Sequence, residues 1–279
     1  MADRKTLLES IILEAGSGLK RYFGRIGLAH AHTKGQAVDL VSRADIETQE
    51  RIVRALKRHF PQDGILAEEG DLSGYQDAHA KGGLWVIDPL DGTVNFLHGY
   101  PLFGVSIAYC RDGVPELGAI YAVAQDEVYW TVKGKGAHRG HVTPRGITRS
   151  KRLKVSTPRE LKDALMVTGF GYDRRERSAF YLGFYDRFLR KVHDVRRSGA
   201  ACIDLAWLAS GCFEGFWEFA LKPWDVAAGA LLVSEAGGRI THFDGKGYSI
   251  FRSLETLATN GRIHDEALGV IRKQLKIKV

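Results

Sequence analysis

The chain has 279 residues, of which 44% are hydrophobic and 26% are charged, and its 40 Lys and Arg outnumber its 33 Asp and Glu to give a formal net charge of +7. This length and composition are those of a globular protein with one large α/β unit or two intimately packed halves, and they exclude a disordered chain. No apolar run approaches the roughly 18 to 20 residues of a membrane span, and the N-terminus does not resemble a signal peptide, so we expect a cytoplasmic protein without a membrane partner.

The positive charge would attract phosphorylated ligands and could also attract nucleic acid, but it is scattered along the chain. Its densest groups are residues 174–177, residues 196–197 and the C-terminal tail, which we interpret as a solvated helix face. The cysteines are Cys110, Cys202 and Cys212, which are too few and too far apart for a disulfide framework or a zinc site. We expect them to be buried apolar side chains.

Two amphipathic helices are predicted near the start of the chain. Apolar residues recur at steps of three and four over residues 6–23 and again over residues 46–60. The second helix has a start signal, because Ser42 and Asp45 have the spacing of a capping box. The segment between the helices, which contains Lys34, is predicted to be a loop that ends in a short strand or turn.

The central feature of the chain is a strand that ends in acidic residues. Residues 84–87, Leu-Trp-Val-Ile, read as a short buried strand, and a tight turn with Asp88, Pro89, Asp91 and Gly92 follows. Carboxylates crowded at the end of an apolar strand repel each other and lose hydration, so a divalent cation should lie between them. An all-oxygen cluster favours Mg²⁺, Mn²⁺ or Ca²⁺ over zinc. Asp-Pro and Asp-Gly are also common turn dipeptides, so plain turn chemistry is the alternative.

The remaining elements divide the chain into two halves. Residues 1–145 are predicted to hold the helices, a strand over residues 65–67 that runs into Glu68 and Glu69, and an antiparallel meander. Residues 140–159 have linker composition, and we place the boundary there. In residues 146–279 strands alternate with helices, which predicts an α/β sheet covered on both faces. The meander strands are expected at 104–110, 117–123, 127–131 and 136–139, and the later strands at 164–170, 192–196, 213–219, 238–242 and 256–260, with helices at 177–191, 200–210, 224–235 and 262–275.

A second motif lies at residues 223–229, Pro-Trp-Asp-Val-Ala-Ala-Gly, and is followed by Glu-Ala-Gly-Gly at 235–238. Asp225 would lie in the first turn of a helix, where its charge is favoured and its side chain can reach forward to a metal ion. A helix cap after a proline turn is the structural alternative.

These two motifs, with the six-residue sequence Asp-Pro-Leu-Asp-Gly-Thr at 88–93 as the first, resemble the two signatures of the inositol monophosphatase family. That family consists of lithium-sensitive, Mg²⁺-dependent phosphomonoesterases, and the resemblance covers residues 30–260. It implies a five-layered αβαβα sandwich of the inositol monophosphatase and fructose-1,6-bisphosphatase type, a homodimer, and two or three Mg²⁺ ions held mainly by the N-terminal half.

The resemblance also implies roles for individual residues. The metal ligands would be Glu68, Asp88, the Leu90 carbonyl, Asp91 and Asp225. Glu68 and Thr93, with Asp45 beside them, would be catalytic and would activate the attacking water. Substrate would be bound by Asp91, Gly92, Thr93, Gly199, Ala201, Glu218 and Asp225, with Lys34 and Glu69 as accessory residues.

Some of these positions have structural alternatives. Asp45 completes the capping box with Ser42, and Thr93 could be a helix N-cap. Glu218 lies between two aromatic residues and could be the solvent face of a strand, and Glu69 could be a surface turn residue.

We therefore expect an inositol-phosphate phosphatase, a hydrolase that acts on inositol 1-phosphate or a related polyol phosphate. One alternative is a bifunctional enzyme that also accepts fructose 1,6-bisphosphate, with Arg174, Arg175 and Arg177 at the second phosphate. A nucleic-acid-associated regulatory protein on the same fold is a further alternative, although the sequence has no recognised nucleic-acid motif.

Overall fold

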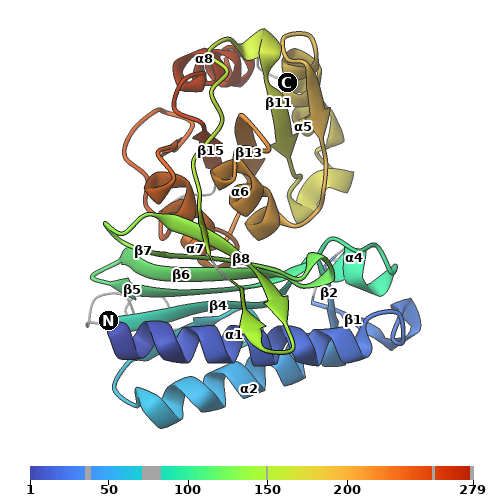
Figure 1. The fold of residues 1–279 in the computed structure, drawn as a ribbon. Coiled ribbons are helices and arrows are strands. Elements are labelled where there is room, and N and C mark those ends of the chain that lie inside the picture. The colour runs from blue at the N-terminus through green and yellow to red at the C-terminus, as the bar shows by residue number, and fades with distance from the viewer. Residues whose placement is uncertain (35–38, 71–82, 149, 253–254, 277–279) are drawn as a thin grey trace.

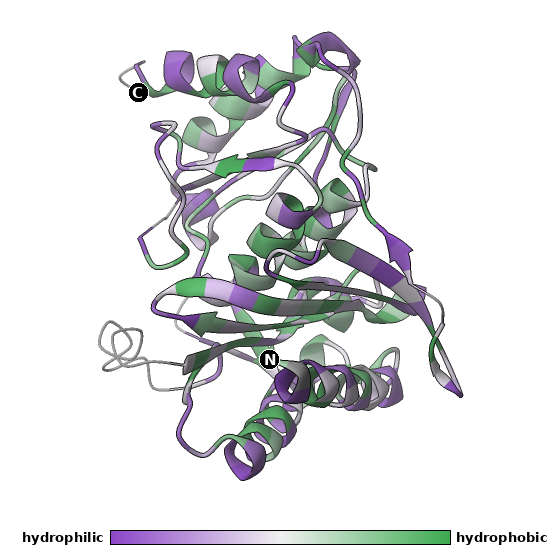
Figure 2. Ribbon diagram, turned by 60° about the vertical axis from the view of Figure 1, so that its left-hand side comes forward, coloured by the Kyte–Doolittle hydropathy of each residue, from purple (hydrophilic) through white to green (hydrophobic). Residues whose placement is uncertain are grey.

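The computed structural model describes residues 1–34, 39–70, 83–148, 150–252 and 255–276. Its helices and sheets form five layers (Figure 1): a helix pair, an eight-stranded sheet, a second helix pair, a five-stranded sheet and a third helix pair. This is the predicted αβαβα sandwich. Figure 2 shows green, hydrophobic segments facing the spaces between layers and purple, hydrophilic segments facing outward.

The first layer consists of helices α1 (Ala2–Tyr22) and α2 (Arg43–His59). Their inward faces, with Leu8, Ile12 and Leu56 buried, belong to one core cluster with residues of the first sheet. Helix α2 begins with the predicted capping box, because the Ser42 hydroxyl accepts from the Ala44 amide and Asp45 Oδ2 accepts from the Ser42 amide at 2.9 Å. Both predicted helices are confirmed.

The first sheet has the strand order β10-β8-β7-β6-β5-β4-β3, with β9 paired to β8. Only the β3–β4 pair is parallel, and the other described pairs are antiparallel, as expected for a meander. Its strands are β3 (Gly64–Ala67), β4 (Gly83–Asp91), β5 (Gly104–Arg111), β6 (Val114–Ala122), β7 (Glu127–Val132), β8 (Ala137–Thr143), β9 (Gly146–Ile147) and β10 (Lys151–Arg152).

Two details of this sheet differ from the sequence-based expectation. Strand β4 continues through Asp91, and its register with β5 shifts between Asp88 and Asp91, where a tight turn was expected. The segment 140–159, expected to be a linker, contains the end of β8 together with β9 and β10, which extend the sheet. Pairing with β8 gives these two-residue segments a regular structure that their sequence does not indicate.

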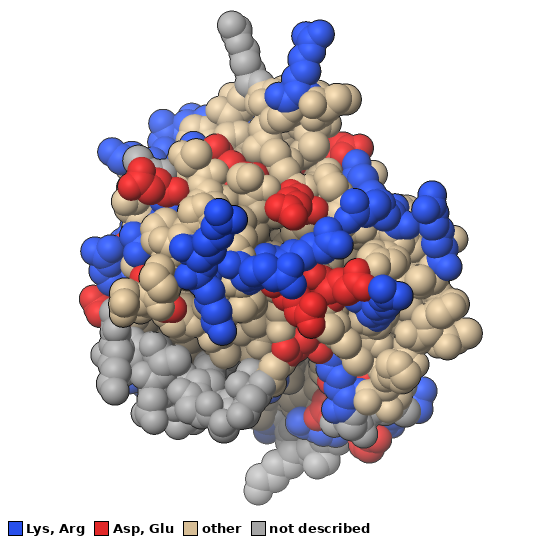
Figure 3. Space-filling view, turned by 90° about the horizontal axis from the view of Figure 1, so that it is seen from below, with Lys and Arg blue, Asp and Glu red and all other residues tan. Residues whose placement is uncertain are grey.

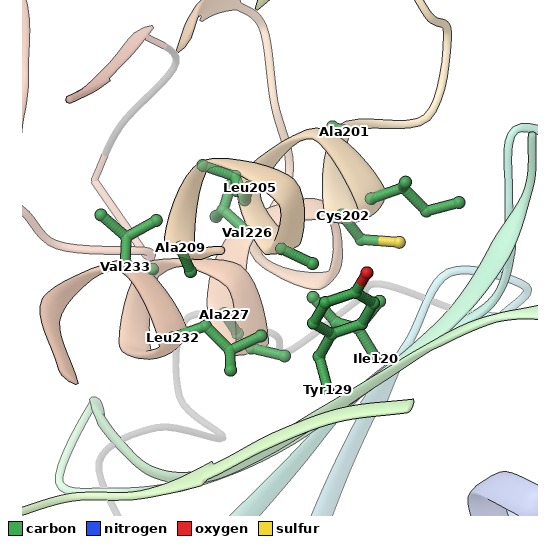
Figure 4. Close-up of a cluster of buried hydrophobic side chains, with 14 of the residues drawn as sticks. Ile120, Tyr129, Ala201, Cys202, Leu205, Ala209, Val226, Ala227, Leu232 and Val233 are labelled. Atoms are coloured by element: carbon green, nitrogen blue, oxygen red, sulfur yellow. The ribbon is translucent and has the colours of Figure 1, made fainter. Parts of the chain in front are cut away.

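The middle layer is formed by α6 (Ala201–Ala209) and α7 (Pro223–Glu235), which pack on each other and on the first sheet. Figure 4 shows side chains of both helices above Ile120 and Tyr129 of the sheet, with Leu205 between the two helices. Gly229 allows the two helices to approach closely, because any Cβ atom at this position would lie only 2.6 Å from Leu205 Cδ1. Close packing of α7 fixes the position of its first turn, which carries Asp225.

The second sheet has the order β12-β11-β13-β15-β14. Helices α5 (Ser178–Leu189) and α8 (His264–Leu275) share a hydrophobic cluster with its outer face, so the sheet is covered on both sides as predicted. Its strands are β11 (Leu165–Thr168), β12 (Asp194–Arg196), β13 (Gly215–Phe219), β14 (Arg239–Thr241) and β15 (Glu255–Thr259).

Short elements complete the described chain. Strands β1 (Ala31–Thr33) and β2 (Leu40–Ser42) form a hairpin, and helix α4 (Thr93–Leu97) follows β4 directly. Single helical turns lie at η1 (Leu28–His30), η2 (Val123–Gln125), η3 (Leu161–Asp163) and η4 (Tyr172–Arg175).

Two further expectations can be compared with the structure. Cys110 and Cys202 are buried as expected, but Cys212 is exposed, because it lies in the turn that follows α6. Among the described helices, none combines the length and the apolar character that crossing a membrane requires.

Candidate active site

A cavity of about 150 Å³ lies where the end of β4 meets the second half of the chain. Residues from both halves line it, so it exists only because the two sheets are packed around α6 and α7. Its acidic residues are Glu68, Asp88, Asp91, Glu218 and Asp225. The structure thus brings together carboxylates that are more than 150 residues apart in the sequence.

The first two aspartates stand at the end of β4. Asp88 Oδ1 accepts from the Leu90 amide at 3.0 Å, and Asp91 Oδ2 accepts from the Cys202 amide at 2.6 Å. Burial, followed by the charges of Glu68 and Asp91, raises the pKa of Asp88 well above its usual value. Burial also raises the pKa of Asp91 to about 6, although the hydrogen bond from Cys202 lowers it. Both groups lie where a negative charge is disfavoured unless a cation is supplied.

Asp225 reaches the same cavity from the first turn of α7, as predicted. Its Oδ2 accepts from the Lys222 amide at 2.6 Å, so the residue also caps the helix, and the two expected roles are compatible. Burial, then Glu68 and Asp91, raises the pKa of Asp225. Each of the three aspartates therefore uses one oxygen to accept from a backbone amide.

Lys34 supplies a cation on one side of this cluster. Its Nζ lies 2.8 Å from Glu68 Oε1 and also bonds Glu69. Burial lowers the pKa of Lys34, but Glu68 and Glu69 more than compensate and raise it above its usual value. Burial raises the pKa of Glu69 to about 7, although the hydrogen bond from Lys34 lowers it. The predicted accessory residues Lys34 and Glu69 thus contact the predicted metal ligand Glu68.

The donor chemistry fits a hard divalent cation. Carboxylate oxygens and the Leu90 carbonyl are the ligands that Mg²⁺ prefers, and the raised pKa values of Asp88 and Asp225 show a deficit of positive charge. Within the described residues, no three acidic, histidine or cysteine side chains stand close enough to hold one ion as they are.

Thr93 and Asp45 form a second group beside the acids. The Thr93 hydroxyl lies 2.9 Å from Asp45 Oδ1 and 3.0 Å from the Leu90 carbonyl oxygen. Asp45 is fully buried and does not line the cavity, so it reaches the site only through Thr93. Gly92, in the left-handed region with φ 85°, is the residue that precedes helix α4, so Thr93 is the first helical residue and not the N-cap.

Three of the predicted substrate residues, Gly199, Ala201 and Glu218, form the wall of the cavity that the second half of the chain supplies. Gly199 has φ 90° and, with Ala201, lies where β12 gives way to α6. Glu218 faces the cavity and not the solvent. Its carboxyl group packs against Gly169, where a Cβ atom would lie 1.9 Å from Glu218 Oε1 and leave no room for it. Burial raises the pKa of Glu218 well above its usual value, although Arg197 lowers it. The solvent-face alternative for Glu218 is therefore wrong.

Sequence reasoning missed two residues of this wall, Tyr172 and Arg197, and placed Arg174 in a cluster that the structure separates. Arg174 lines the cavity together with Tyr172 and Arg197, whereas Arg175 and Arg177 do not. Arg177 instead bonds Asp173 at 3.0 Å. Burial and then Glu68 and Asp225 raise the pKa of Tyr172 above its usual value. The Arg-Arg-Ser-Gly sequence at 196–199 was the available signal for Arg197, and Tyr172 had none.

Comparisons with known proteins agree with this geometry. The model of the "Inositol monophosphatase family" matches residues 3–276. The chain is 37% identical to an inositol-1-monophosphatase of Caulobacter vibrioides, over 93% of this chain and 97% of that protein. It is 34% identical to a fructose-1,6-bisphosphatase/inositol-1-monophosphatase of Aquifex aeolicus, over 96% and 94%.

Other similar proteins have different names. A putative Nus factor SuhB of Neisseria meningitidis serogroup B is 39% identical, over 84% of each chain. Among solved structures, an IMPase of Thermotoga maritima superposes with a TM-score of 0.85 at 32% identity, covering 98% of each chain.

Proposed function

Because the chain belongs to the inositol monophosphatase family, we propose that it is a Mg²⁺-dependent phosphomonoesterase that hydrolyses inositol 1-phosphate or a related polyol phosphate. The observation that carries this proposal is the group of buried carboxylates at the end of β4 and the start of α7. The pKa values of Asp88, Asp91 and Asp225 are all raised, which indicates a place for cations that the protein does not itself supply.

The metal ions would be held by Glu68, Asp88, the Leu90 carbonyl, Asp91 and Asp225, in a set of two or three Mg²⁺. When bound, Mg²⁺ neutralises charge on the phosphoryl group and makes water a stronger acid. We assign Glu68 as the base that takes a proton from the attacking water. Thr93, held by Asp45, orients that water for attack on phosphorus.

Substrate recognition would use the wall that the second half of the chain supplies. The Glu218 carboxylate accepts hydrogen bonds from polyol hydroxyls, and backbone groups of Gly199 and Ala201 add further contacts. Gly92 and Thr93 bind the phosphate through their amides. We propose that the halves 1–145 and 146–279 act as one catalytic unit, in a lithium-sensitive cytoplasmic homodimer.

A phosphate-release assay tests this proposal. We expect release from inositol 1-phosphate that requires Mg²⁺ and stops on addition of EDTA. Release that is unchanged by EDTA would exclude the metal-dependent mechanism, and absence of release from every phosphomonoester in a broad panel would exclude the phosphatase assignment.

A second candidate, a bifunctional enzyme that also hydrolyses fructose 1,6-bisphosphate, is favoured by one specific observation. Arg174 and Arg197 line the cavity together, and their mutual repulsion, after burial, lowers the pKa of Arg174. Two adjacent guanidinium groups would suit a second phosphate. If so, the Arg174→Gln variant should lose turnover of the bisphosphate and keep turnover of inositol 1-phosphate, whereas equal loss of both would count against it.

A nucleic-acid-associated role is the third candidate, and the basic outer face of α2 is the observation that bears on it. Figure 3, seen from below, shows Lys and Arg crossing this side of the molecule, with acidic residues beside them. The exposed basic residues of α2 are Arg43, Arg51, Arg54, Lys57 and Arg58. Retention of RNA at physiological salt by the Asp88→Asn variant would support this role, and absence of binding would dismiss it.

A further inference from the structure

The backbone between β12 and α6, residues 197–200, forms the part of the substrate wall that has no regular structure of its own. This segment, which we name the wall segment, presents Gly199 and Arg197 to the cavity. A substrate contact made by irregular backbone requires that backbone to be held in place from behind. The contacts of Ser198 show how it is held.

The wall segment rests on the turn that follows β4. A Cβ at Gly92 would lie 3.4 Å from the Gly199 carbonyl oxygen and 3.3 Å from Ala200 Cβ. Gly92 and Gly199 both have positive φ values, of 85° and 90°. Two glycine turns, one from each half of the chain, therefore meet at the floor of the cavity.

Asn95 joins the two turns from the N-terminal side. Its Nδ2 donates to the Ser198 carbonyl oxygen at 3.0 Å and to the Leu102 carbonyl oxygen at 2.7 Å. Both protons of the amide group are thus used, and one of them fixes the wall segment. The hydroxyl of the same Ser198 donates to Asp204 Oδ2 from the opposite side, within the first turn of α6.

Asp204 is a buried acid that, like Asp45, does not line the cavity. It is 1% exposed, and its Oδ1 has no hydrogen-bond partner among the described residues. A buried carboxylate with an unfilled oxygen costs free energy, so fold stability alone does not explain an acid here. Its other close charges are Asp91 and Arg197, of which Arg197 is the attractive one.

We propose that Asn95 and Asp204 are positioning residues that clamp Ser198 from the two halves of the chain and so set the backbone of Gly199 and Ala201, and the guanidinium of Arg197, at the substrate wall. The clamp deepens the proposed function and rests on it for its effect on substrate. Cys202 lies two residues after the wall segment, and its amide donates to Asp91. The clamp therefore also connects the wall segment to the acids.

Kinetics with two substrates test this clamp. Inositol 1-phosphate needs the wall segment, whereas p-nitrophenyl phosphate has no leaving-group hydroxyls for it to bind. In Asp204→Ala and Ser198→Ala, we expect the ratio of kcat/KM for inositol 1-phosphate to that for p-nitrophenyl phosphate to fall about tenfold or more, through KM. The double variant should be no worse than either single variant. Ser198→Thr and Asp204→Asn keep the hydroxyl donor and an oxygen acceptor, so both should keep the ratio close to that of wild type.

A matched control is Asp265→Asn on α8, an 84% exposed aspartate that should leave the ratio unchanged. Amide hydrogen exchange measured without substrate gives a readout independent of activity. In Asp204→Ala and Asn95→Ala we expect faster exchange at Gly199 and Cys202 than in wild type.

A lower melting temperature with an unchanged ratio and unchanged exchange would show a purely structural role and overturn the clamp. If the wild-type protein hydrolyses neither substrate, the proposed function fails. Hydrogen exchange then still decides the clamp, because unchanged exchange at Cys202 overturns it and faster exchange supports it.

Discussion

Strand β4 meets buried carboxylates at both of its ends. At its start, Asp63 accepts three hydrogen bonds from Arg4, at 2.9, 3.0 and 3.2 Å, and a fourth from Trp85 Nε1 at 3.0 Å. The Arg4 guanidinium also lies over the rings of Phe60 and Tyr109, at 4.4 and 4.5 Å from their centroids. The charge of Asp63 is therefore matched by a cation that belongs to the fold.

At the other end of β4, Asp88 and Asp91 have backbone amides as partners and, among the residues that the structure describes, no cationic side chain. Lys34 bonds Glu68 and Glu69 beside them and leaves the aspartates unpaired. One end of β4 thus meets a carboxylate that stabilises the fold, from the residue before β3, and the other end carries two carboxylates that are costly to it. This difference in pairing indicates which end of β4 binds a ligand, because a buried acid that stabilises a fold is usually paired with a cationic side chain of the same protein.

Asp91→Asn should have the largest effect of the changes considered. The substitution removes a charge that we propose to hold Mg²⁺, so activity should fall on the order of 10³-fold. Because burial disfavours the carboxylate, the free energy of unfolding without Mg²⁺ should stay equal or rise. Phosphate release and urea unfolding measure the two quantities. Wild-type turnover in this variant would refute the site.

His264 extends the comparison to a second polar group that serves the fold. Its ring nitrogens lie 3.0 Å from the Thr241 and Thr259 hydroxyls, and burial lowers its pKa to about 4. The unfolded imidazole takes up a proton near pH 6.5, so stability contributed by neutral His264 is present above that pH and is lost as the pH falls toward 4.

Urea unfolding between pH 7 and pH 4 measures this loss. Its contribution should be up to about 3 kcal/mol, and His264→Gln should show a correspondingly flatter dependence on pH. The difference between the two proteins isolates His264 from the acids, so parallel curves would contradict the prediction.

Asp63→Asn tests the paired end of β4. Loss of the charge that Arg4 meets should lower the free energy of unfolding by about 2 kcal/mol. Phosphatase activity at a temperature where the variant is folded should stay close to wild type. A large loss of kcat in the folded variant would show that the two ends of β4 do not have separate roles.

Lys34→Gln should have the smallest effect. Removing an ammonium group next to Glu68 should strengthen Mg²⁺ binding severalfold, equivalent to about 1 kcal/mol or less. Calorimetric titration of the variant with Mg²⁺ measures this, with Lys20→Gln as the control, because Lys20 bonds Asp126 on another part of the surface. Weaker binding in Lys34→Gln would mean that Lys34 assists the metal site.

Local patterns were enough to predict most of the elements. The period of apolar residues predicted α1 and α2, and the spacing of Ser42 and Asp45 predicted the capping box that starts α2. Pairing between distant segments was harder to predict. The short strands β9 and β10 exist because β8 offers them a partner, and segments of two residues carry no pattern that indicates it.

The residues of the site likewise divide into those that local sequence patterns predict and those that only the packing of distant segments reveals. Acids at the ends of apolar runs, such as Asp88 and Glu68, could be chosen from sequence because buried charge is rare there. Tyr172 and Arg197 lie in ordinary polar surroundings along the chain, and only the packing of two halves brings them to the cavity. Asp204 was hidden for a related reason, since one acid within a helix looks like a solvent-exposed position.

The hydrogen bonds that the three aspartates accept from backbone amides limit how the metal site could be redesigned. Asp88, Asp91 and Asp225 each accept from an amide, so exchanging any of them for His or Cys would disturb a turn or a helix start along with the ion preference. The side chain of Glu68 has no such bond to described backbone. A redesign toward zinc or another softer metal would therefore disturb the backbone least at Glu68, although it would replace the proposed base and the partner of Lys34.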